Sequence, residues 1–365
     1  MIYLDHAATS FPKPQTVQLA MNRAMERCAN PGRGGHKPAM AAAETVFSCR
    51  ETAGEFFHCG PEQVVFTANC THGLNMAIHT LVKPGARVLI SGFEHNAVTR
   101  PLHGLKAELV VAGTRLFDQQ DTMEQFESAL KRGVDAAVFT HVSNVFGYIL
   151  PVEALAALCR QYGVPFAVDA AQSAGSLPVD FARWGADFVA MPGHKGLLGP
   201  MGTGLLLCAR TPKALLAGGT GSQSLQQEMP DFLPDGAEAG TLNVPGIAGL
   251  EAGMRHISRI GLATIARRER TLAKQCADGL QALGFRVYSG ENQGGVVSFV
   301  PEMECQLAAD RLAQRGVAVR AGLHCAPLAH RSAGTLETGT VRVSLGPNTK
   351  NRQIADFLQN ARFLR

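Results

Sequence analysis

Two residues near the middle of the sequence have the chemistry of an enzyme that handles carbonyl compounds. Lys195 is the single lysine of VAMPGHKGLLG (189–199), a small-residue loop that follows an apolar run, and Asp169 ends the run PFAVD. A lysine amine kept from water condenses readily with carbonyl groups. A carboxylate and a lysine separated by a strand, a helix and a strand therefore suggest a Schiff-base enzyme.

A third candidate is Cys325, in the loop RAGLHCAPLAH after a predicted strand. It lies next to His324 and downstream of Arg320, and positive charges at these residues would favour the reactive thiolate. We expect the other eight cysteines to be inert core residues. A metal site made of His324, Cys325 and His330 is the competing interpretation, but the spacing fits no usual zinc pattern.

Polar residues follow four of the apolar runs. Asn144 comes after FTHVS, Thr71 opens a helix after VVFT, Asp169 ends PFAVD, and Lys195 follows FVAM. Ligands of open α/β sheets lie beyond the carboxyl ends of the strands, so we expect these groups to converge. Arg342, inside the apolar run TVRVS, needs a partner, and its planar fork suits a substrate carboxylate.

The elements that position these residues alternate between short apolar runs and helical patterns. Runs that are apolar on both faces and separated by helices are typical of a mostly parallel sheet covered on both sides. We therefore predict an α/β fold whose large lobe has a sheet of about seven strands. The runs lie at 64–67, 87–91, 107–112, 136–143, 165–171, 188–191 and 204–208.

The C-terminal part predicts a second, smaller α/β lobe, with strands at 296–300, 317–321 and 340–345. The predicted division is a large domain at 15–250 and a small domain made of 1–14 and 251–365. A helical stretch from about 246 to 283 should be interrupted near Gly253 and Gly261. The Gly-, Pro- and Ser-rich segment 217–245 is more typical of a functional loop than of a linker.

The composition indicates the compartment and the kinds of partner of the protein. Nine scattered cysteines without a CxxC pair favour a reducing compartment, and MIYLDHAATSFPKP has no apolar core of a signal peptide. No apolar run approaches the length of a membrane span. The net charge of +4 is interspersed, which argues against a nucleic-acid partner and suits anionic small molecules. We expect a cytoplasmic protein that does not bind membranes.

Three motifs carry a family resemblance: DAAQSAG, GHKGLLGPMGTG and RAGLHCA. With them, the chain resembles the fold-type I pyridoxal-phosphate enzymes of the class V aminotransferase superfamily, from YLDHAATSFPKP to VRVSLGPNT. Within that superfamily it is similar to the cysteine desulfurases and selenocysteine lyases. The third motif is the one that selects this branch.

The resemblance implies roles around pyridoxal 5'-phosphate. Lys195 would join the cofactor aldehyde and later carry protons, and Asp169 would keep the pyridine nitrogen protonated. His95 matches the histidine that stacks on the ring and also handles protons. Asn144 is expected near the phenolic oxygen, and Gln172 on the same side.

The resemblance implies that the cofactor phosphate is bound by Thr71, by the start of the helix at 70–73 and by His194. Pro192 departs from the family, in which a hydroxyl often stands two residues before this histidine. GAEAGTLN resembles the stretch through which a protomer offers a threonine, here Thr241, to its neighbour's phosphate. The chain is therefore expected to be a homodimer.

On the substrate side, the resemblance implies that Arg342 binds the substrate carboxylate. It also implies that Arg320 and His324 belong to the substrate-binding pocket. Arg33 and His36, in the early Gly-rich loop, match a region that borders this pocket in relatives. The implied reaction converts L-cysteine to L-alanine and leaves a persulfide on Cys325.

The form RxGxHCA and the short connection to the strand at 340 resemble the group II branch, which passes sulfur to a protein acceptor. Three alternatives remain open at this point. The first is a selenocysteine lyase acting on L-selenocysteine, and the second is an aminotransferase or other lyase that does not need Cys325. The third is a sulfur-carrier subunit without catalytic activity.

Overall fold

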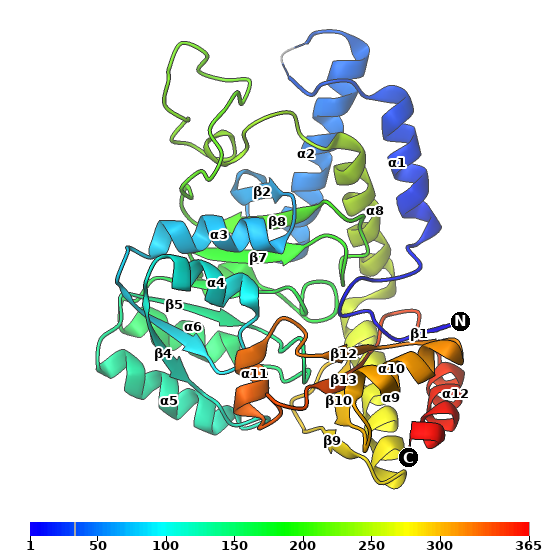
Figure 1. The fold of residues 1–365 in the computed structure, drawn as a ribbon. Coiled ribbons are helices and arrows are strands. Elements are labelled where there is room, and N and C mark those ends of the chain that lie inside the picture. The colour runs from blue at the N-terminus through cyan, green and yellow to red at the C-terminus, as the bar shows by residue number, and fades with distance from the viewer. Residues whose placement is uncertain (33, 365) are drawn as a thin grey trace.

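Seven apolar runs form one sheet in the computed structural model, which describes residues 1–32 and 34–364 (Figure 1). Their neighbours pair in parallel except for β8, which is antiparallel to the strand on each side. The predicted mostly parallel sheet of seven strands is confirmed. Across the sheet the strands are β2 (Val64–Thr67), β8 (Gly204–Cys208), β7 (Phe188–Pro192), β6 (Phe166–Asp169), β5 (Ala136–Thr140), β3 (Arg87–Ser91) and β4 (Glu108–Ala112).

Both faces of this sheet are covered by helices, because consecutive strand residues point to opposite sides and both kinds are apolar. Val65 packs on one face while Phe66 packs on the other. α3 (Cys70–Leu81) and α4 (Asn96–Gly104) cover the first face (Figure 1). The opposite face carries α2 (Lys37–Phe57), α5 (Gln119–Lys131), α6 (Val152–Gln161), α7 (Phe181–Trp184) and α8 (Val244–Ile260).

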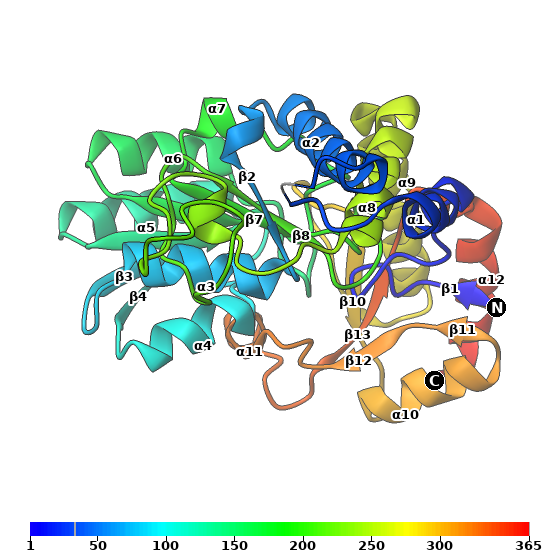
Figure 2. The same ribbon diagram turned by 90° about the horizontal axis from the view of Figure 1, so that it is seen from above.

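A second sheet follows in the C-terminal part and has its own apolar core. The N-terminal β1 (Ile2–Tyr3) pairs with β11 (Val317–Ala318) and lies on the side of this sheet (Figure 2). α1 (Gln15–Arg27) then leads into the large part. The second sheet has the order β12 (Arg320–Gly322), β13 (Thr340–Ser344), β10 (Val296–Val300), β9 (Arg286–Tyr288), with α9 (Leu262–Ala282), α10 (Cys305–Gln314), α11 (Pro327–Ser332) and α12 (Asn351–Ala361).

The helical stretch after residue 244 differs from the prediction at one of its two glycines. The chain breaks at Gly261, which has a φ of 86° and separates α8 from α9. The predicted interruption at Gly253 is wrong, because α8 runs through this residue without a break. A Cβ at Gly253 would lie 2.3 Å from the Leu197 carbonyl oxygen, so the glycine lets the helix approach the loop that carries Lys195.

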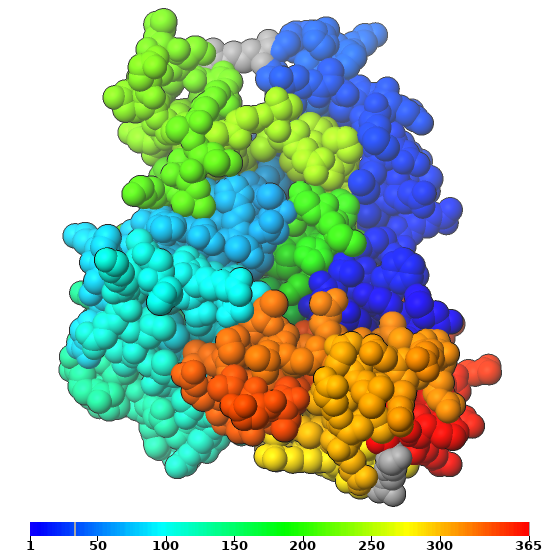
Figure 3. Space-filling model, viewed as in Figure 1, coloured from blue at the N-terminus to red at the C-terminus, as the bar shows by residue number. Residues whose placement is uncertain are grey.

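Between β8 and α8 the described chain is irregular apart from a short 3-10 turn at Asp235–Ala237. Figure 3 shows this segment projecting from one end of the molecule. Its base is anchored by Glu238, whose side chain is covered and accepts hydrogen bonds from the Phe66 N–H and from Arg50. Among the described helices, none is both long and apolar enough to cross a membrane.

Candidate active site

The loops that follow the parallel strands meet around a cavity of about 100 Å³. β5, β6 and β7 are parallel neighbours, so their carboxyl ends lie at one edge of the sheet. The structure brings together the predicted polar residues of this edge. Seven of them line the cavity: Thr71, His95, Asn144, Asp169, Gln172, His194 and Lys195.

Asp169 is the last residue of β6 and is buried. Its Oδ1 accepts a hydrogen bond from the Ala171 N–H at 2.9 Å, and the thiol of Cys70 lies 3.5 Å from the same oxygen. No hydrogen bond to Oδ2 is found in residues 1–32 and 34–364. The carboxylate is therefore held from one side and can accept a cationic N–H from the cavity.

Lys195 follows β7 in a loop whose close packing requires a glycine at the next position, Gly196. A Cβ at Gly196 would lie 2.3 Å from the Ala174 carbonyl oxygen, so the loop packs directly on the segment after Asp169. Burial lowers the pKa of the Lys195 ammonium, and the charge of Asp169 opposes this effect. A larger fraction of the amine is then neutral and nucleophilic near pH 7.

His95 caps the N-terminus of α4. Its Nδ1 accepts a hydrogen bond from the Ala97 N–H at 3.0 Å, so the ring proton of the neutral form is assigned to Nε2. Burial lowers the pKa of the imidazole, and the neighbouring Asp169 opposes this lowering. Near neutral pH, His95 is thus a neutral ring with one fixed tautomer at the cavity wall.

His194 is held by the N-terminal segment, for which the sequence predicted no role in the site. Its Nδ1 lies 3.1 Å from the Thr9 hydroxyl, and its carbonyl accepts hydrogen bonds from Ser10 and from the Lys13 ammonium. Burial, with Lys195 and Lys13 nearby, lowers the pKa of His194 to about 4. The N-terminal segment thus fixes the loop just before Lys195.

Thr71 lies in the first turn of α3, with its side chain exposed at the cavity. The helix begins after Asn69, whose side chain accepts from the His72 N–H at 2.9 Å. The first N–H groups of a helix have no acceptor within the helix. This helix end can therefore bind an anion that enters the cavity.

Arg342 connects this cavity to the second sheet. It is buried in β13, donates to the Asn144 carbonyl at 3.0 Å and pairs with the Asp5 carboxylate at 2.9 Å. Its Nε has no hydrogen-bond partner among the described residues. Arg320, opposite Arg342 in the antiparallel pair β12–β13, binds the same carboxylate. Asp5 thus provides the partner that a buried arginine requires.

Cys325 is the one cysteine of the nine that is classed as exposed. Its backbone is left-handed, with a φ of 55°, and its carbonyl accepts from the Asn96 N–H at 2.7 Å. Burial lowers the pKa of Arg342, and Asp5 and, more weakly, Cys325 oppose this lowering. The hydrogen bond from Asn96 ties the turn that carries the thiol to the start of α4, beside His95.

Comparison with known proteins identifies the family. The family model described as aminotransferase class-V matches residues 2–357, nearly the whole chain. The chain belongs to the class V aminotransferase family.

Among curated proteins, this class V chain is 31% identical to a probable cysteine desulfurase of Pyrococcus abyssi, over 98% of this chain and 92% of the relative. It is 32% identical to a probable cysteine desulfurase of Methanothermobacter thermautotrophicus, over 94% and 90%. Among solved structures, the apo cysteine desulfurase of Thermococcus onnurineus matches with a TM-score of 0.90 and 33% identity, over 100% of this chain and 94% of that one. The predicted family and its fold are confirmed.

The expected positive charge of His324 in this class V chain is wrong. His324 is buried, and its pKa falls to about 2, chiefly because burial penalises the charged ring and Arg342 adds repulsion. Its two ring nitrogens lie near the Arg320 carbonyl and the His330 ring. His324 is therefore a neutral structural residue beside Cys325, and positive charge near the thiol comes from the arginines.

Two predicted residues lie apart from the cavity around Lys195. Thr241 lines separate clefts near Glu238. His36 is exposed and caps the N-terminus of α2, where its Nδ1 accepts from the Ala39 N–H at 3.3 Å. Arg33, which was grouped with His36, lies outside the described residues.

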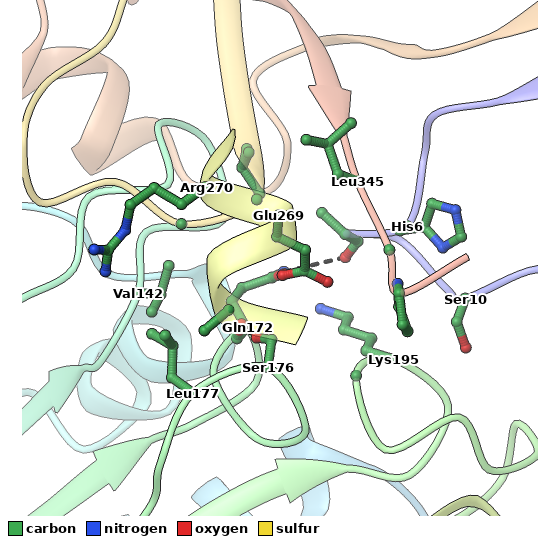
Figure 4. Close-up of a pocket in the computed structure, with 18 of the residues that line it drawn as sticks. His6, Ser10, Val142, Gln172, Ser176, Leu177, Lys195, Glu269, Arg270 and Leu345 are labelled. Carbon is green, nitrogen blue, oxygen red and sulfur yellow. Dashed lines mark hydrogen bonds between the residues drawn. The ribbon is translucent and has the colours of Figure 1, made fainter. Parts of the chain in front are cut away.

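A second cavity, of about 50 Å³, also borders Lys195 (Figure 4). Sequence reasoning missed it, because its walls come from the N-terminus, the segment after β6 and α9. Gln172 and Glu269 share its wall with Lys195. Burial raises the pKa of the Glu269 carboxyl to about 8, so this side chain is largely a neutral acid at pH 7.

Proposed function

We propose that this chain is a pyridoxal-phosphate-dependent cysteine desulfurase. It would convert L-cysteine to L-alanine and leave a persulfide on Cys325. The observation that carries the proposal is the exposed Cys325 thiol, presented by a left-handed turn that is hydrogen-bonded to Asn96 and Asn144. The two archaeal relatives bear the name probable cysteine desulfurase, which supports the same reading.

The residues present fit the cofactor. Asn144 Oδ1 is buried and has no hydrogen-bond partner in the described chain, which suits an acceptor facing a bound group. The free oxygen of Asp169 matches a pyridinium N–H, and the start of α3 matches a phosphate. Thr71 and His194 would add phosphate contacts, while Pro192 lines the cavity without a hydroxyl to contribute.

When bound, pyridoxal phosphate withdraws electrons from the substrate α-carbon. The chain's own residues supply the remaining functions. Lys195, with its lowered pKa, would take and return protons at the substrate carbons. Arg342, through its unpartnered Nε, would bind the substrate carboxylate, with Arg320 adding charge nearby. His95 would pack on the ring from the start of α4.

The sulfur transfer balances without an external reductant. The Cys325 thiolate attacks the substrate sulfur, an S–S bond forms and the Cβ–S bond breaks. The electron pair of the broken bond stays on Cβ, which takes a proton and becomes the methyl group of alanine. The Cys325 sulfur and the substrate sulfur are each oxidised by one electron while Cβ is reduced by two, and the products are alanine and Cys325–S–SH.

The proposal includes a homodimer in which Thr241 reaches the neighbour's phosphate site. Its position outside the cavity of its own chain supports that arrangement. An exposed Cys325 suits transfer of the sulfur to a protein acceptor in the cytoplasm. We also propose the domain division at 15–250, with 1–14 joined to 251–365, which the pairing of β1 with β11 supports.

The test compares wild type with Cys325→Ala, each supplied separately with L-cysteine and L-selenocysteine. Alanine and protein-bound persulfide are measured, with Cys208→Ala, a buried cysteine of β8, as the control. We expect persulfide from cysteine in wild type and control and none in Cys325→Ala. Absence of persulfide in the wild type would overturn the proposal.

The same experiment separates the alternatives. Alanine release from selenocysteine that is retained by Cys325→Ala, with little turnover of cysteine, would point to a selenocysteine lyase. Full turnover of cysteine by Cys325→Ala would point to another class V reaction. A Lys195→Ala variant that leaves the visible absorption unchanged would argue against a role of this lysine in cofactor binding.

A further inference from the structure

The turn that carries Cys325 has an unusual backbone. His324 and Cys325 are consecutive non-glycine residues in the left-handed region, with φ values of 52° and 55°. Non-glycine residues seldom adopt this conformation, and two in succession need support from their surroundings.

Two hydrogen bonds fix its carbonyl groups from the large lobe. The Asn144 side-chain Nδ2 donates to the His324 carbonyl at 2.8 Å, and the Asn96 N–H donates to the Cys325 carbonyl at 2.7 Å. Asn96 follows His95, and Asn144 lines the cofactor cavity. These bonds tie the turn to the candidate active site, but they do not hold its inner side.

The inner side is held by a row of side chains that the proposed reaction does not use. The rings of His324 and His330 stack with centroids 5.6 Å apart and an interplanar angle of 13°. His324 Nδ1 lies 3.4 Å from His330 Nε2, and His330 Nδ1 lies 2.8 Å from the Thr335 hydroxyl. All three side chains are buried, with His330 at 0% and Thr335 at 1% exposed.

The proton positions along this row follow from the contact of His324 with the Arg320 carbonyl. His324 Nε2 lies 3.2 Å from the Arg320 carbonyl, which can only accept, so Nε2 is assigned the proton. Burial lowers the pKa of His324 to about 2 and that of His330 to about 4, so both rings are neutral. His324 Nδ1 then accepts from His330, and His330 Nδ1 accepts from Thr335.

The result is a directed chain of hydrogen bonds from Thr335 through both histidines to the backbone of β12. Each link has one donor and one acceptor, and each buried group on the path is satisfied only if the others are in place. The chain includes His324, the first residue of the turn. Removing its first donor leaves a buried acceptor on His330 and loosens the rings on which the turn rests.

We propose that the row His324–His330–Thr335 is the positioning device that sets the left-handed turn and presents the Cys325 thiol to the substrate. This inference rests on the proposed function, because it assigns these residues to the sulfur-transfer step. His330 and Thr335 are positioning residues that act through His324 and the turn.

The test uses the matched pair Thr335→Val and Thr335→Ser in the cofactor-loaded protein. Valine keeps the shape of threonine without the hydroxyl, and serine keeps the hydroxyl. In Thr335→Val we expect single-turnover persulfide formation on Cys325 to slow about tenfold, with the cofactor absorption and the cysteine-induced spectral change retained. Thr335→Ser should stay within about twofold of the wild type.

Hydrogen–deuterium exchange gives a readout that does not depend on catalysis. The peptide covering 320–332 should exchange about tenfold faster in Thr335→Val than in Thr335→Ser. If the wild type forms no persulfide, the proposed function fails, and this exchange comparison still decides whether the row holds the turn.

If Thr335→Val does not fold, the comparison is repeated at His330. His330→Gln keeps a donor for His324, whereas His330→Leu has none, so only the leucine variant should show the two effects. Unchanged exchange in Thr335→Val or His330→Leu would overturn the proposal. Faster exchange with an unchanged rate of persulfide formation would overturn it as well.

Discussion

The carboxylate of Asp5 accepts a hydrogen bond from the Arg342 guanidinium at 2.9 Å, across 337 positions of sequence. The same carboxylate binds Arg320. One N-terminal acid thus orients Arg342, which is proposed to bind the substrate carboxylate, and Arg320 next to it.

Arg342→Lys tests this orientation. An ammonium cannot donate in the fixed fork geometry to both Asp5 and the Asn144 carbonyl. We expect the KM for L-cysteine to rise about tenfold or more, with a smaller change in kcat. Arg352→Lys, at an exposed position of α12, is the control and should leave KM unchanged. Equal KM values for both variants would contradict the assigned role.

Asp169→Asn tests the charge beside Lys195. Because the Asp169 charge raises the pKa of Lys195 against the effect of burial, its loss should lower that pKa further. After removal of bound carbonyl compounds with hydroxylamine, acylation of Lys195 is followed by peptide mass spectrometry across pH. Half-maximal modification should move to lower pH in Asp169→Asn, and not in the exposed Asp278→Asn. An unchanged midpoint in Asp169→Asn would show that the carboxylate does not act on this amine.

Glu269→Gln tests the buried acid of the second cavity. The native pKa is raised from 4.5 to about 8, so the folded state binds more protons than the unfolded state in this interval. Wild-type stability should therefore fall as pH rises from about 4.5 to 8, and glutamine removes this loss.

Urea unfolding at pH 6 and pH 9 measures the effect. Relative to the wild type, Glu269→Gln should gain about 2 to 3 kcal/mol of stability between pH 6 and pH 9. Glu302→Gln, at an exposed position, should follow the wild type at both. A pH-independent difference would mean that Glu269 is ionised in the folded protein.

Gly253→Ala tests the contact of α8 with the Lys195 loop. The new Cβ would meet the Leu197 carbonyl at 2.3 Å, so the loop or the helix must move. We expect a loss of about 1 to 3 kcal/mol in the free energy of unfolding and weaker cofactor retention. Gly104→Ala, at a helix glycine with open space around it, should be neutral or slightly stabilising. A Gly253→Ala protein that resembles Gly104→Ala in both measurements would refute the argument.

The sequence determined the features that depend on local pattern. Runs of apolar residues on both faces required a covered, mostly parallel sheet, and β2, β3 and β8 have the predicted bounds. Once strands are parallel, their carboxyl ends share an edge, so the grouping of Asp169, Asn144 and Lys195 could be predicted from their places after strands.

Only the tertiary structure decided the contacts between distant segments. A single acid such as Asp5 has no periodic signature, so its pairing with Arg342 could not be read from local pattern. Glycine is typical of a helix break, and so an interruption was predicted at Gly253. In the folded protein Gly253 lies inside α8, where the absence of a side chain lets Leu197 approach closely. His324 was predicted to carry a positive charge that would favour the Cys325 thiolate, but burial lowers its pKa and keeps the ring neutral. Burial and long-range partners set charge and conformation, and both arise only when the chain has folded.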